Sequence, residues 1–140
     1  MSDTRAAVRD QLLLDALGNP LDLNRIDWHV RQHNPADTQT EWQTETVETI
    51  RSVVADGLFR LGGEVVRGEH LGGVATEGEE FVAWHQTLDR CLQKISHNYV
   101  KHYDDPQRWM YAAYLELTEQ GEQQARALES KDVESYRRLE

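Results

Sequence analysis

The chain has 140 residues, and its 25 Asp and Glu against 15 Lys and Arg give a formal net charge of −10. This length fits one domain with its own core, and a hydrophobic content of 39% is too low for a membrane protein. The acidic balance argues against a surface that wraps a phosphate backbone, because nonspecific affinity for nucleic acid depends on Lys and Arg. A single cysteine, Cys91, excludes an intrachain disulfide and a cysteine-rich zinc site.

The first ten residues lack the apolar stretch of a secretory signal. No apolar run approaches the ~20 residues that span a bilayer. We therefore expect a cytoplasmic protein with a single domain over residues 1–140.

Periodic apolar residues predict three helices in the first part of the chain. The first covers about Thr4 to Leu17, and a shorter one follows Leu21-Asp22 and ends at Asn34-Pro35. The third, from about Thr40 to Gly57, has the clearest pattern, with one apolar side formed by Val47, Ile50, Val54 and Leu58. Gly57 suits the left-handed position after its end.

A β-hairpin is expected next. Leu58–Leu61 is typical of a short strand, Gly62-Gly63 of a turn, and Glu64–Arg67 of a returning strand. The glycine-rich and acidic stretch from Gly68 to Glu80 has the composition of a loop.

The last part of the chain predicts a helix, a strand and a second helix. The helix covers about Thr87 to His102, with a buried seam of Leu88, Leu92, Ile95 and Tyr99. Trp109 to Leu117 is typical of a strand, and Thr118 can cap the final helix. The charged tail over about residues 129–140 fits either a helix or a frayed end.

Two stretches resemble the winged-helix family. Residues 46–61, through Asp56-Gly57-Leu58, are similar to a third helix that runs into the first wing strand. Residues 114–122 are similar to the last wing strand entering the C-terminal helix, and the two stretches together cover about a fifth of the chain. The order of three helices, a strand, a loop and a strand agrees with this resemblance.

The resemblance implies an α+β fold with three N-terminal helices, a small antiparallel sheet and a C-terminal helix. About fifty residues separate Leu61 from Tyr114, so the wing would hold a helical insertion over about residues 68–108. The chain also resembles small uncharacterised bacterial proteins that have a winged-helix-like core with such an insertion. This resemblance implies no particular function.

In the winged-helix family the third helix enters the major groove of DNA. The residues expected on its exposed side, and therefore the DNA-contact candidates, include Gln43, Thr44, Thr49 and Arg51. From Thr40 to Gly57, however, four acidic side chains stand against Arg51 alone, and such a helix would repel phosphates. A DNA-binding transcriptional regulator is therefore the second interpretation.

The first interpretation is a non-enzymatic adaptor or inhibitor that binds a protein partner, an immunity protein or antitoxin being one concrete form. Aromatic residues are enriched in protein interfaces, and Trp42 beside Glu41 and Glu45 is the main candidate. Trp28 with Arg31 is the second. A homodimer is a further form that the association could take.

Metal binding and catalysis are less favoured. His29 and His33 are four residues apart on one helix face, a spacing that can chelate a metal ion. Asp37 is a candidate third ligand, but the sequence provides no firm one, and a surface pair is the favoured interpretation. A catalytic Cys91 would need a base such as His85 close in space. We expect neither a metal nor a cofactor, and an enzyme ranks third.

Overall fold

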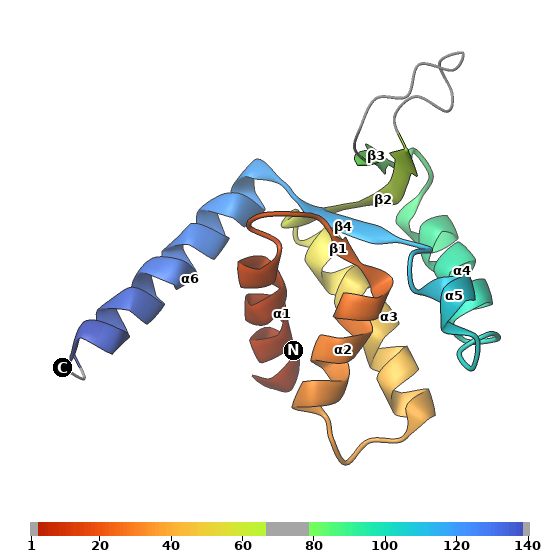
Figure 1. The fold of residues 1–140 in the computed structure, drawn as a ribbon, viewed down its shortest axis with the longest axis horizontal. Coiled ribbons are helices and arrows are strands. Elements are labelled where there is room, and N and C mark those ends of the chain that lie inside the picture. Colours follow the sequence, from red (N-terminus) through yellow and green to blue (C-terminus); the bar gives the residue numbers. More distant parts are fainter. Residues whose placement is uncertain (1–2, 67–78, 139–140) are drawn as a thin grey trace.

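The computed structural model describes residues 3–66 and 79–138, which form an α+β arrangement with a small antiparallel sheet (Figure 1). No helix in these two ranges is both long enough and apolar enough to cross a membrane. The elements in chain order are α1 (Asp3–Asp15), β1 (Leu21–Asp22), α2 (Leu23–His33), α3 (Gln39–Ala55), β2 (Phe59–Val66), β3 (Glu79–Ala83), α4 (Leu88–Tyr99), α5 (Pro106–Trp109), β4 (Tyr114–Leu117) and α6 (Glu119–Arg138).

The sheet has the strand order β1-β4-β2-β3, and every neighbouring pair is antiparallel. β2 pairs on one side with β4, where Leu61 lies opposite Leu115. On its other side it pairs with β3, where Gly62 lies opposite Ala83. In Figure 1 the sheet lies across one end of α1, α2 and α3, so it closes that end of the helical layer.

Local sequence explains where α3 begins and ends. The Thr38 hydroxyl accepts a hydrogen bond from the Glu41 N–H at 3.3 Å, and the Glu41 carboxylate accepts one from the Thr38 N–H at 3.1 Å. This reciprocal pair is a capping box. After the helix, Gly57 has φ of 77°, the left-handed conformation expected for it.

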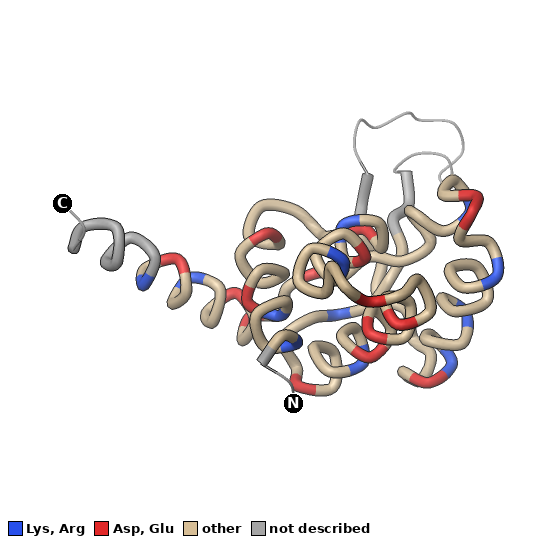
Figure 2. Tube along the Cα trace, turned by 90° about the horizontal axis from the view of Figure 1, so that it is seen from below, with Lys and Arg blue, Asp and Glu red and all other residues tan. Residues whose placement is uncertain are grey.

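One core joins the helices to the sheet. α1 packs against α2, α3 and α6, while α4 packs against α3 and the short α5. The fully buried large side chains come from α1, α2, α3, β2, α4 and β4 and include Leu12, Leu23, Ile26, Ile50, Phe59, Ile95, Tyr99 and Leu115. The last helix is continuous to Arg138, and Figure 2 shows that the described part of α6 already extends away from the other helices.

The predicted hairpin turn at Gly62-Gly63 is wrong. Both glycines and the first three residues of the predicted returning strand lie inside the continuous strand β2, whose antiparallel partners are β3 and β4. A Cβ atom at Gly62 would lie 2.2 Å from the Val82 carbonyl oxygen, so glycine is required by the close approach of β3. Glu79 and Glu80, expected in the loop, belong to β3, and the rest of that loop, residues 67–78, lies outside the described residues.

Two further boundaries differ from the prediction. The strand expected over Trp109 to Leu117 begins only at Tyr114, because Pro106 opens the short helix α5 and Trp109 is buried at its end. The helix predicted to reach His102 ends at Tyr99. The two-residue strand β1 was not predicted, since Leu21 and Asp22 are too short a run to show a period.

Candidate functional site

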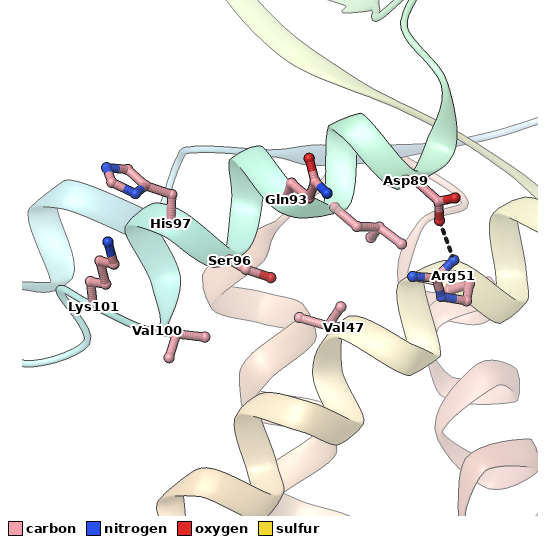
Figure 3. Close-up of a pocket in the computed structure, with 9 residues that line it drawn as sticks. Val47, Arg51, Asp89, Gln93, Ser96, His97, Val100 and Lys101 are labelled. Atoms are coloured by element: carbon pink, nitrogen blue, oxygen red, sulfur yellow. Dashed lines mark hydrogen bonds and ion pairs between the residues drawn. The ribbon is translucent and has the colours of Figure 1, made fainter.

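A groove runs between α3 and α4, which lie antiparallel with Arg51 beside Asp89 at one end (Figure 3). Its larger hollow has a volume of about 600 Å³, and a smaller one of about 220 Å³ continues it towards the start of α3. Val47, Ser96 and Val100 line both hollows. We call these two hollows together the α3–α4 groove; its other lining residues are Thr40, Gln43, Thr44, Glu48, Arg51, Asp89, Leu92, Gln93, His97 and Lys101.

The middle of the groove is apolar. Leu92 is buried beneath it, Val47 is half-buried, and Val100 is 47% exposed. Figure 3 shows Val47 on α3 facing Val100, which follows the last residue of α4, with Ser96 of α4 between them. Val47 and Val100 together form the accessible apolar surface of the groove above the buried Leu92.

Gln43 supplies an unsatisfied donor in the smaller hollow. The residue is 5% exposed, and its amide Nε2 has no hydrogen-bond partner among the described residues. Leaving a buried donor unpaired costs about 1–3 kcal/mol of stability. Buried polar groups are otherwise almost always bonded, and within the described residues the Thr49 hydroxyl is a second exception beside the Gln43 amide.

The charges at the two ends of the groove differ. The Arg51 guanidinium donates to Asp89 at 2.7 Å and lies 3.7 Å from Glu48, and the hydrogen bond to Asp89 raises the pKa of Arg51. At the other end lie His97, in the last turn of α4, and Lys101, in the turn that follows α4, and neither forms an ion pair within the described residues. At one end of the groove Asp89 and Glu48 neutralise the charge of Arg51, whereas at the other end the ammonium group of Lys101 has no ion pair within the described residues.

A buried hydrogen-bond network beneath the groove fixes α4 against α2 and α3. The Tyr99 hydroxyl donates to Asp27 Oδ1 at 2.5 Å and lies 3.2 Å from the Thr46 hydroxyl. Asp27 is fully buried and also accepts from Arg31 at 2.8 Å and from the Tyr103 hydroxyl. A buried carboxylate needs this many donors because burial alone would disfavour its charge.

The same network raises the pKa of both tyrosines. Burial is the largest cause, and the negative charge of Asp27 adds to it. The pKa of Tyr103 rises to about 12, and that of Tyr99 rises further. The Trp109 ring stacks on Tyr103 with ring centres 5.1 Å apart and meets Tyr99 edge-on, so the network is enclosed by aromatic rings.

The main predicted interface side chains all make contacts within the chain. Trp42 is half-buried against the core, and its indole N–H donates to the Asn34 carbonyl at 2.7 Å. Glu41 belongs to the capping box, and Glu45 accepts two hydrogen bonds from Arg5 at 2.7 and 2.9 Å. These contacts hold the start of α3 in place.

The two residues of the second predicted interface candidate, Trp28 and Arg31, point in different directions. Trp28 is 40% exposed, and the Arg25 guanidinium lies 5.0 Å from its ring centre. Arg31 instead turns towards the buried Asp27. The structure therefore leaves Trp28 accessible and uses Arg31 in the network beneath the groove.

The expectation that Gln43 and Thr49 lie on the exposed side of the third helix is wrong, because both are buried. The prediction treated α3 as open on one side, whereas α2 and α4 pack along it. Of the four DNA-contact candidates, Thr44 is exposed and Arg51 is half-buried in its ion pair with Asp89.

The two histidines of α2 make separate contacts. His29 Nε2 lies 2.9 Å from Asp15 Oδ2, and the His33 ring bonds to the His29 carbonyl at 3.0 Å. In residues 3–66 and 79–138, no three His, Cys, Asp or Glu side chains come together as metal ligands. Cys91 is buried, which raises the pKa of its thiol, and its Sγ donates to the Gln86 carbonyl.

Comparison of the chain with protein-family models, with curated proteins and with solved structures found no match. The α3–α4 groove is therefore the main ground for assigning a function. It combines an open apolar lining, an unpaired buried donor and an unpaired cation.

Proposed function

We propose that this chain is a protein-binding domain, an adaptor or inhibitor without catalytic activity, and that its partner binds in the α3–α4 groove. An inhibitor of the immunity-protein or antitoxin type is one concrete form. The observation that carries the proposal is the buried Gln43 amide without an acceptor, next to the exposed apolar surface of Val100. A partner that covers this surface would satisfy the donor and bury the valine together.

Our proposal for the fold is a winged-helix-like core with an insertion. Three helices precede β2, and β2 pairs with β4 although β3, α4 and α5 lie between them in the chain. The two stretches that resemble the family also meet, since the Thr118 hydroxyl donates to the Gly57 carbonyl at 2.6 Å. These features support the arrangement of a wing whose two strands are separated by additional elements.

DNA binding has less support. α4 packs along α3, and two of the four candidate side chains are buried, which does not favour a role for α3 in a major groove. We expect weak or no binding to random duplex DNA at ~0.15 M salt, because α3 is also net acidic. A fluorescence titration measures this, and submicromolar binding with a steep salt dependence would favour the regulator instead.

Site-specific photo-crosslinking in the native cell tests the protein-binding proposal. A photoreactive phenylalanine analogue replaces Gln93, an exposed residue of the groove, and in a control protein it replaces Tyr111, which is 60% exposed and does not line the groove. We expect a discrete adduct with one polypeptide from position 93 and none from position 111. The adduct should disappear when Val100→Asp is added, whereas no adduct, or the same adduct from both positions, would refute the proposal.

A further inference from the structure

We infer that the α3–α4 groove accepts an amphipathic helix of the partner, with apolar side chains against Val47 and Val100, a hydrogen-bond acceptor at Gln43 and a carboxylate near Lys101. This inference deepens the proposed function and rests on it. It identifies the partner segment by its secondary structure, its polarity and the sign of its charge.

The length and direction of the groove fit a helix. Its lining on α3 extends from Thr40 to Arg51, twelve residues, and the eleven steps between them correspond to about 16 Å at 1.5 Å per residue. A helix of three turns has this length and presents apolar side chains at i, i+3 or i+4, and i+7. Such a helix would lie along the seam of the antiparallel pair.

An extended segment fits less well. Residues 40–51 and 89–99 of the lining lie within helices, whose backbone N–H and C=O groups are largely bonded to one another. A strand placed on this surface would therefore find few backbone partners, and its own N–H and C=O groups would face valine and leucine side chains. A helix satisfies its backbone internally and needs only side-chain contacts.

The polar groups set the chemistry of the partner. Gln43 Nε2 is a donor, so the partner must bring an oxygen, which a helix carries on Glu, Gln, Asp or Asn. Lys101 has no ion pair within the described residues, whereas Arg51 is already paired with Asp89. A carboxylate at the Lys101 end is thus favoured over a cation, in spite of the acidic charge of the whole chain.

A peptide selection tests the inference directly. Random 14-residue peptides displayed on phage are selected on the wild-type chain after removal of those that bind the Val100→Asp variant. We expect enriched peptides with apolar residues at helical spacing and with Asp or Glu, which become helical on binding by circular dichroism. Val100→Asp should weaken a selected synthetic peptide at least tenfold, because a charge would enter the apolar contact.

Charge reversal separates the Lys101 contact from general electrostatics. Lys101→Glu should weaken the acidic peptide at least threefold and strengthen its Lys-substituted form. Lys94→Glu is the matched control, since Lys94 is an exposed lysine of α4 that contacts Trp84 and does not line the groove. Equal effects of the two substitutions would overturn the assignment of the carboxylate to Lys101.

Gln43→Leu tests the acceptor. We expect it to weaken the peptide at least fivefold without lowering the thermal midpoint of the free chain, because it removes a donor that has no partner there. Unchanged affinity would overturn the contact.

The outcomes distinguish the inference from the proposed function. Groove-binding peptides that are proline-rich, extended or basic would refute the helical acidic partner and leave protein binding in place. Absence of any enrichment that depends on Val100 would also overturn the inference. The photo-crosslink from position 93 decides the proposed function separately, because it depends on the native partner and on no assumption about its secondary structure.

Discussion

Tyr99 of α4 donates its hydroxyl hydrogen to Asp27 of α2 at 2.5 Å, across 72 positions of sequence. The bond lies in the interior, where Asp27 also meets Arg31 and Tyr103. Since α4 forms one wall of the α3–α4 groove, this bond helps to set the position of that wall. The same pair of residues therefore links the stability of the fold to the shape of the candidate site.

The first prediction concerns this bond. Tyr99→Phe keeps the ring and removes one donor from a buried carboxylate, so the free energy of unfolding should fall by about 1–3 kcal/mol. Urea denaturation followed by fluorescence measures the change. Tyr111→Phe, at an exposed position, is the control and should leave the midpoint unchanged. A loss at Tyr99 below about 0.3 kcal/mol, within the usual range of surface substitutions, would contradict the role of the network.

The second prediction is a loss of stability at alkaline pH. Burial and the charge of Asp27 raise the pKa of Tyr103 to about 12, whereas an unfolded tyrosine ionises near pH 10. The folded state then holds this proton more tightly, so the stabilisation is complete below about pH 10 and is lost as the pH rises towards 12. Urea midpoints across this range should fall for the wild type and fall less for Tyr103→Phe. Equal slopes in the two proteins would count against this assignment.

The third prediction uses the unpaired donor of the groove. Gln43→Leu removes a buried amide N–H without an acceptor and should leave the free energy of unfolding unchanged or raise it by about 1 kcal/mol. Differential scanning calorimetry gives the midpoint and the enthalpy. Thr46→Val is a suitable comparison, because the Thr46 hydroxyl has a contact with Tyr99 and its loss should destabilise. A clear destabilisation by Gln43→Leu would show that the amide is already bonded in the free chain.

The fourth prediction tests the junction of α6 with the sheet. A Cβ atom at Gly121 would lie 2.0 Å from the Leu58 carbonyl oxygen, which is backbone and cannot move cheaply. Gly121→Ala should therefore cost about 1–3 kcal/mol, the range of overpacked cores. Gly18→Ala is the matched control, since a Cβ there meets nothing within 4 Å. If both alanine variants unfold at the same urea concentration, the close packing of Gly121 under Leu58 is wrong.

Much of the fold follows from local sequence. The apolar spacing in α3 and α4 predicts both helices, and Ile50, Leu92 and Ile95 are buried as expected. Gly57 and Thr118 mark helix boundaries through their own conformational and capping preferences. Such features depend on residues within one or two turns, and a sequence shows them directly.

The parts that were not predicted depend on contacts between distant segments. Gly62-Gly63 has the composition of a turn, and only the approach of β3 explains why glycine is needed inside a strand. Gln43 and Thr49 are polar residues on a strongly helical stretch, and their burial comes from α2 and α4 lying alongside. No local pattern carries that information.

Only part of the α3–α4 groove can be predicted from the sequence. The sequence points to Gln43 as a contact residue for DNA and to Val47 as part of the apolar side of its helix. Val100 gave a usable signal, since it is an apolar residue outside the seam of Leu92, Ile95 and Tyr99. The groove itself requires the antiparallel placement of α3 and α4, which the sequence does not specify.

The pairing of β1 with β4 has a consequence for synthesis on the ribosome. Leu21 lies opposite Leu115, so the first strand stays without its neighbour until 94 further residues have been made. At about 5–20 residues per second this delay is on the order of 5–20 s. Until then α1, α2 and α3 can associate through local contacts, but their sheet-facing ends stay uncovered. The chain should thus emerge as a helical intermediate whose exposed apolar ends attract chaperones, and it reaches protease resistance only after β4 has left the exit tunnel.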